Sequence, residues 1–273
     1  MKTLNISLFF LALTLSATRL PAQSEATQQV VVPLSEPGKP YTLDVHIMTG
    51  NIKVIGYEGK DLVMDVVADT STHKGGESHN GMRRLGGNES LDFTAQENNN
   101  TVSVSTGLSH GLRSLTIKVP QNGVKLRLGT VEQGSVTVSN VSGEIEVNNL
   151  NGDVTLTGIS GSVVASNLSG NVIVDFKTVD PKAPMAFTSL SGKIDVTLPA
   201  DTKINLKMKS DNGQMYSDFD VVVDPSKPRV NKTSEDHYYK ISIDDWIFGK
   251  INGGGPEMMM KSMSGNIYIR KTK

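Results

Sequence analysis

Three acidic residues in the central third of this 273-residue chain have the types and spacing to do chemistry: Glu144, Glu146 and Asp153. Two carboxylates in different environments can perform acid–base catalysis on a glycosidic bond, and β-helical polysaccharide-degrading enzymes place acids on one face. A basic group usually steadies the charge in such a site, yet residues 128–176 contain no Lys or Arg. We therefore interpret the three acids as a solvated face, and we expect no catalytic residues and no enzymatic activity.

The sequence offers no set of residues typical of a metal or cofactor site. Its five histidines are scattered along the chain: His46, His73, His79, His110 and His237. His73 and His79 share a glycine-rich loop, but no acidic or His partner lies there at ligand spacing. The chain contains no cysteine, which excludes thiolate ligands and disulfides. The glycines at 253–255 lack the Lys-Ser/Thr pair that follows a phosphate-binding loop. We expect neither a metal nor a cofactor.

Aromatic residues near the C-terminus support two interpretations. Tyr238, Tyr239 and Trp246 lie close together in the sequence, followed by Phe248. If these side chains are exposed on a sheet, they form a platform that binds sugars by stacking. If they are packed inside, they belong to the core of the last strands, with Trp246 buried. We treat Tyr238, Tyr239 and Trp246 as a possible ligand face, with core packing as the alternative.

A repeat must position all of these side chains. Five glycines follow one another at intervals of nine residues: Gly134, Gly143, Gly152, Gly161 and Gly170. Self-similarity at a fixed period is typical of a stacked repeat architecture. The blocks lack the double glycine and the aspartate of calcium-binding nine-residue repeats, so we do not expect calcium.

Each block has the pattern of one short strand followed by a corner. In residues 143–151, Ile145 and Val147 alternate with two glutamates, which places the apolar pair on one face of a strand. Two asparagines then interrupt the strand, and asparagine tolerates the backbone of a tight corner. We expect Leu150 to point inward again after this corner.

Two or three blocks can complete one coil, and the sequence does not choose between them. With two blocks per coil, Val136 aligns with Val154 and Val172 on strands about 4.8 Å apart. Each inward aliphatic side chain contributes about 1.5–3 kcal/mol when it is fully buried. No single block buries enough to be stable, so stability must come from stacking on its neighbours.

The same pattern, apolar-(Ser/Thr/Asn)-Gly-x-apolar-x-apolar, recurs outside the strict run around Gly50, Gly192 and Gly265. We therefore predict an all-β fold, a β-helix-like solenoid built on these structural glycines. The predicted organisation is a signal peptide at 1–22, an extended lead-in at 23–40, and the solenoid at 41–273, with strict repeats at 131–176 and a mobile loop at about 70–88.

The first 22 residues are typical of an export signal. Lys2 precedes an apolar core at residues 6–15, and Leu20-Pro21-Ala22 precedes a plausible cleavage point. This apolar core is too short for a permanent anchor, and no later segment is apolar enough to cross a bilayer. We therefore expect an exported bacterial protein that does not span the membrane and is located in the periplasm or at the cell surface.

Charge excludes nucleic acid as a partner. The formal net charge is −1, and the only charged residues in the span 128–176 are acids. Nucleic-acid binding requires a basic patch, and the repeats have the opposite sign.

The repeat also carries a resemblance to a known family. Residues 143–174 resemble the Ser-Gly-Asp-Val/Ile repeats of a bacterial putative adhesin family of unknown function. Residues 191–201 resemble the strand and turn that follow its repeats, and residues 251–256 followed by 264–267 resemble its closing motif. The resemblance covers most of the mature chain. It implies a right-handed β-helix-like solenoid in the bacterial envelope and supplies no catalytic residues.

We therefore expect an exported, non-catalytic β-solenoid of the cell envelope with an adhesin-like binding or scaffold role. An unknown envelope component or a glycan is the possible ligand. Two alternatives remain: a carbohydrate-active enzyme on a β-helix, and a purely structural envelope protein.

Overall fold

The computed structural model of the protein describes residues 27–68, 93–107, 112–225, 230–235, 238–243 and 246–273. In these ranges every regular element is a β-strand, as expected for an all-β fold. Accordingly, no helix long and apolar enough to cross a bilayer occurs in the described part of the chain. The predicted signal peptide and the loop predicted at about 70–88 lie outside the described residues.

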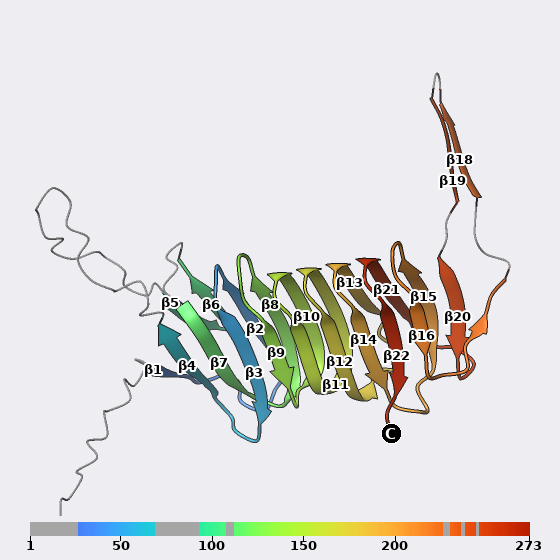
Figure 1. Ribbon diagram of the computed structural model, residues 1–273. Helices are drawn as coiled ribbons and strands as arrows, with labels where there is room; N and C mark the ends of the chain where they lie inside the picture. Colours follow the sequence, from blue (N-terminus) through green and yellow to red (C-terminus); the bar gives the residue numbers. More distant parts are fainter. Residues whose placement is uncertain (1–26, 69–92, 108–111, 226–229, 236–237, 244–245) are drawn as a thin grey trace, which may run out of the picture.

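The strands stack in a row and form two opposing sheets, which are joined because β11 belongs to both (Figure 1). In spatial order, the first sheet contains β5 (Phe93–Asn98), β6 (Thr101–Thr106), β2 (Tyr41–Ile47), β8 (Asn122–Thr130), β10 (Ser142–Asn151), the second half of β11 (Val154–Ser169), β13 (Met185–Ser191), β21 (Glu257–Ser264), β15 (Ile204–Ser210), β20 (Ile247–Ile251) and β17 (Val222–Val223).

The second sheet contains β1 (Thr27–Val32), β4 (Leu62–Ala68), β7 (Leu112–Pro120), β3 (Asn51–Tyr57), β9 (Val136–Ser139), the first half of β11, β12 (Val172–Val179), β14 (Ile194–Leu198), β22 (Ile267–Lys271) and β16 (Met215–Ser217). Strands β18 (Val230–Glu235) and β19 (Tyr238–Ile243) form a separate antiparallel pair. Strand β1 comes from the lead-in that the sequence places before the solenoid.

Two blocks make one coil. Val136 pairs with Val154, and Val154 pairs with Val172. This ladder continues through Ile194 to Ile267, and none of these five side chains is exposed. The alignment predicted for two blocks per coil is therefore confirmed, and the three-block alternative is wrong.

The coils do not follow chain order at either end of the stack. Strands β2 and β3 lie between the pair β6 and β7 and the pair β8 and β9. Strands β21 and β22 lie between the pair β13 and β14 and the pair β15 and β16, as Figure 1 shows. The C-terminal coil is therefore an interior coil with hydrogen-bonded neighbours on both sides.

The predicted structural glycines stand in two columns at the corners. One column contains Gly50, Gly134, Gly152, Gly170, Gly192 and Gly265, and the other contains Gly143 and Gly161. At Gly152 the backbone has a φ of +107°, and an added Cβ would lie 2.6 Å from the carbonyl oxygen of Gly134. Any side chain here would therefore overlap the backbone of the neighbouring coil, which explains why glycine recurs.

Leu150 points outward, so the prediction that it points inward was wrong. Strand β10 continues through the two asparagines to Asn151, and the alternation of faces continues with it. Asn149 therefore takes the inward position with 3% exposure, while Leu150 is 41% exposed. The buried amide of Asn149 donates a hydrogen bond to the carbonyl oxygen of Gly152, 2.9 Å away. The corner lies later than predicted, at Asn151 and Gly152.

The inward ladder predicts different losses of stability for three substitutions. Val154→Asp should destabilise the protein by more than about 4 kcal/mol, because it places an unpaired charge among buried valines. Val154→Ala should still cost about 2 kcal/mol, whereas Glu144→Ala, at an exposed position, should change stability by no more than about 0.5 kcal/mol. Urea unfolding measures all three. Equal stability of the valine and glutamate variants would contradict the assignment of faces.

The glycine column predicts a steric penalty that can be separated from backbone strain. Gly38 has a φ of +85° with no atom within 4 Å of an added Cβ, whereas Gly152 has the close contact described above. Both Gly→Ala substitutions incur strain of about 1–3 kcal/mol, but Gly152→Ala should cost at least about 1 kcal/mol more because the neighbouring coil must shift. Thermal unfolding of the two variants tests this, and equal losses would show that the contact is unimportant.

Candidate ligand-binding surfaces

The three candidate acids do not form one cluster. Glu144 and Glu146 lie on the outer face of the first sheet, and Asp153 lies at the corner that begins the second. Asp153 accepts hydrogen bonds from the backbone N–H and side-chain amide of Asn171, at 2.8 and 3.1 Å, and so joins two coils. In the described ranges no three His, Asp or Glu side chains gather in a way that could hold a metal.

Basic partners accompany the two glutamates, contrary to the expectation from residues 128–176. Strand β8, just before that span, brings Lys125 to 2.9 Å from Glu144 and Arg127 to 4.0 Å from Glu146. Both basic residues precede the repeats in the sequence, and only the pairing of β8 with β10 brings them beside the glutamates. All four side chains are substantially exposed, so these ion pairs are solvated. Each glutamate has one exposed basic neighbour, so the two carboxylates lie in similar environments.

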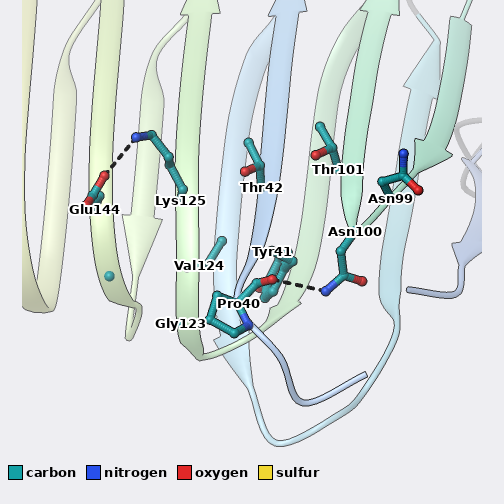
Figure 2. A pocket seen from close by; sticks show the side chains of 11 residues that line it. Pro40, Tyr41, Thr42, Asn99, Asn100, Thr101, Gly123, Val124, Lys125 and Glu144 are labelled. Carbon is teal, nitrogen blue, oxygen red and sulfur yellow. Dashed lines mark hydrogen bonds and ion pairs between the residues drawn. The ribbon is translucent and has the colours of Figure 1, made fainter. Parts of the chain in front are cut away.

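A shallow hollow of about 450 Å³ crosses the outer face beside the first of these pairs (Figure 2). Thr101, Thr42, Lys125 and Glu144 lie side by side on β6, β2, β8 and β10 and form a polar row. At its lower edge Asn100 donates a hydrogen bond to the carbonyl oxygen of Pro40, at 3.1 Å. These groups can hydrogen-bond to a ligand, but the charged pair is already satisfied internally.

Tyr41, beneath this hollow, has a structural role. Its hydroxyl donates to the carbonyl oxygen of Pro120 at 2.6 Å, and the side chain is 4% exposed. Burial, followed by the proximity of Tyr57, raises the pKa of the Tyr41 phenol far above its ordinary value. The phenol is therefore neutral at every physiological pH and cannot act as a base.

A second groove lies just before the corner glycines Gly152, Gly170 and Gly192, and we call it the corner groove. Its apolar wall is a row of leucines and one methionine at the same position of successive coils: Leu150, Leu168, Leu190 and Met263. These side chains are 41–47% exposed. Its polar wall is the neighbouring outward row: Asn148, Ser166, Thr188 and Lys261. The groove has a volume of about 530 Å³.

The floor of the corner groove is polar and buried, and two of its side chains bond to backbone carbonyl oxygens, whereas Oδ1 of Asn149 is buried without a hydrogen-bond partner. Asn167 donates to the carbonyl oxygen of Gly152 at 2.9 Å, and Ser189 donates to that of Gly170 at 3.3 Å. Both floor residues are at most 5% exposed. The floor therefore holds the coils together, and only the two walls face a ligand. The apolar wall was not predicted from the sequence, because Leu150 was expected in the core. Its signal in the sequence is the apolar residue that recurs before each Ser/Asn-Gly.

The structure describes only part of the predicted aromatic ligand face. Tyr238 and Tyr239 lie in β19, which pairs with β18, and their side chains lie outside the described residues. Trp246 is half-buried, and the ammonium of Lys207 lies 4.9 Å from the centre of its ring. The alternative, core packing of these aromatic residues, predicts a buried Trp246, and the half-buried side chain differs from that.

A different aromatic pair is exposed at the end of the second sheet. The rings of Tyr216 and Tyr268 stack with centres 5.2 Å apart and planes 11° apart. We call this pair the tyrosine stack. Tyr268 could have been found from the sequence, because it occupies an outward position in the block that begins at Gly265.

The remaining candidate residues are the histidines and the glycines near the C-terminal end of the chain. His46 lies 2.8 Å from Asp44 on the outer face, while the other four histidines lie outside the described residues. Gly253 and Gly254 have φ values of +86° and +88° in the turn after β20, as expected for a corner.

Comparison with protein-family models finds a similarity over part of the chain. The family model for the Toastrack domain, DUF4097, matches residues 130–245. That span begins with the repeats in which the resemblance to a putative adhesin family was found. A search of curated proteins found no match.

Several solved structures are similar over most of the chain at low sequence identity. A putative cell adhesion protein from Clostridium sporogenes ATCC 15579 has 13% identity and a TM-score of 0.43, over 90% of this chain and 100% of the other. A putative adhesin from Bacteroides fragilis NCTC 9343 has 11% identity and a TM-score of 0.39, over 92% and 99%. A putative lipid binding protein from Parabacteroides distasonis ATCC 8503 has 10% identity and a TM-score of 0.29, over 90% and 97%.

Proposed function

We propose that this protein is an exported, non-catalytic β-solenoid of the bacterial cell envelope that binds a glycan chain in the corner groove. One observation carries the proposal: the same outward position is apolar in four neighbouring coils, and those side chains stay 41–47% exposed. Rows of large apolar side chains on a surface mark interaction sites rather than ordinary solvated faces.

The chemistry of the two walls favours a glycan. The leucine wall suits the C–H faces of sugar rings, and the opposite wall offers an amide, two hydroxyls and an ammonium to sugar hydroxyls. The groove is straight and crosses three strand spacings, or about 14 Å, so it can take several sugar units lengthwise. Thr188 donates to Ser166 and Asn148 donates to Glu146, each at 3.1 Å. A lipid chain could not use the remaining donors and acceptors of this wall, whereas sugar hydroxyls could.

The arrangement of charges supports binding rather than catalysis. The glutamates of β10 are neutralised by exposed basic neighbours, and Asp153 is committed to Asn171 at a different corner. Acid–base chemistry on a sugar requires two carboxylates whose pKa values are set apart by their environments. A carbohydrate-active enzyme on a β-helix and a purely structural envelope protein are the rival proposals.

Two further parts of the proposal rest on the sequence. The signal-like segment at 1–22 supports export to the periplasm or the cell surface. We also propose that the coils wind in the right-handed sense, because connections between parallel strands are right-handed in nearly all known cases.

A binding and turnover screen tests the proposal. Purified protein is titrated with soluble bacterial envelope polysaccharides and mucin-type host glycans, and reducing ends and unsaturated products are followed in the same samples. We expect binding without turnover. The double variant Leu168→Ser/Leu190→Ser should bind at least about tenfold more weakly, because two apolar contacts are lost. Val31→Ser, at an exposed valine of β1, is the matched control and should bind normally.

Each rival has its own outcome in this screen. Product formation that disappears in a Glu144, Glu146, Asp153 triple alanine variant would establish the enzyme. Absence of glycan binding by the wild type would leave the structural role, and equal weakening by Val31→Ser would show that the groove is not the site.

A further inference from the structure

The tyrosine stack is the middle of a longer layered arrangement. Asp195, which is 7% exposed, accepts hydrogen bonds from Nε and Nη2 of Arg270 at 2.6 and 3.1 Å. This holds the guanidinium with its central carbon 5.1 Å from the centre of the Tyr268 ring. Asp195 lies on β14, and Tyr216 lies on β16, on the opposite side of β22. The layers therefore run from guanidinium to Tyr268 to Tyr216.

The stack has an open end at Tyr216. Among the described residues, β16 pairs only with β22, so no strand continues the sheet beyond it. Tyr216 is 53% exposed. An added strand would place its own side chain one step of about 4.8 Å further along, which is close to the spacing of the existing layers. The edge therefore offers both a ring face and unpaired backbone groups.

The charges near the edge strand β16 favour a cation as the next layer of the stack. Residues 210–225 contain four aspartates, and the nearby ammonium of Lys271 lies 4.9 Å from the centre of the Phe219 ring. Asp211 pairs with Lys209 at 3.3 Å, whereas Asp218 and Asp220 are exposed. Asp218 follows Tyr216 by two positions, accepts a hydrogen bond from the backbone N–H of Lys271 at 3.3 Å and contributes to the field at Arg270. The negative face of a tyrosine ring and neighbouring carboxylates both attract a cation.

We propose that the edge strand β16 docks an extended basic peptide segment, with an arginine of that segment stacked on the open face of Tyr216. The same arrangement already exists within the protein, where Asp195 holds the guanidinium of Arg270 over the ring of Tyr268. Backbone hydrogen bonds to β16 supply affinity, and the ring with its aspartates supplies selectivity for arginine. This site is separate from the corner groove and does not depend on glycan binding.

Fluorescence anisotropy with a labelled synthetic peptide tests the proposal. The probe alternates arginine with threonine or valine, and its partner probe replaces each arginine with citrulline, which keeps the shape and removes the charge. The wild type should bind the arginine peptide at least tenfold more tightly. Tyr216→Leu should weaken binding about fivefold or more, while Tyr216→Phe should retain it. Asp218→Asn should weaken binding and reduce its dependence on salt.

Val31→Ala is the matched control, because Val31 is 55% exposed on β1, which pairs only with β4 among the described strands. It should leave the affinity unchanged. Equal binding of the arginine and citrulline peptides would overturn the proposal, as would an unaffected Tyr216→Leu variant that melts like the wild type. If Tyr216→Leu does not fold, the two peptides on the wild type and the Asp218→Asn variant decide the question.

Discussion

Consecutive coils approach so closely at the corner glycines that no side chain fits between them. The backbone N–H of Gly152 donates to the carbonyl oxygen of Ser169 at 2.9 Å, and that of Gly170 donates to Ser191 at 2.8 Å. These bonds join one coil to the next at the point where the chain turns. A Cβ at either glycine would overlap the carbonyl oxygen of the adjacent coil. The glycine column therefore sets the register of the whole stack.

Because the coils are stacked in register, the residues at one position of the repeat form a row along the molecule. Inward positions become ladders such as Val136, Val154 and Val172, which form the core. Outward positions become surface rows, so one apolar residue per block yields a continuous apolar wall, and two tyrosines on neighbouring strands yield a stack. Such rows suit extended ligands. The acids of the repeat do not all share one row, because the corner separates Asp153 from Glu144 and Glu146.

The sequence predicted the elements whose signal is local and missed those that depend on how coils are ordered. Strand alternation and the glycine interval were sufficient to predict the β-fold and the alignment of Val136 with Val154. The outward direction of Leu150 was not predictable from turn residues, because burying Asn149 requires a carbonyl acceptor at the corner. The partners of Glu144 and Tyr268 were also missed, because they come from β8 and β16, outside their own repeats. The interior position of the C-terminal coil has no local signal at all.

The interior position of β21 and β22 allows the most direct test of the claim that stability comes from the register between coils. Hydrogen exchange followed by mass spectrometry reports the opening of each segment of the native protein. Because β21 and β22 are bonded on both sides, their amides should be as protected as those of β10 and β11, and far more protected than those of β16 and β17 at the end of the stack. Rapid exchange throughout residues 257–271, comparable to that of β16 and β17, would contradict the account.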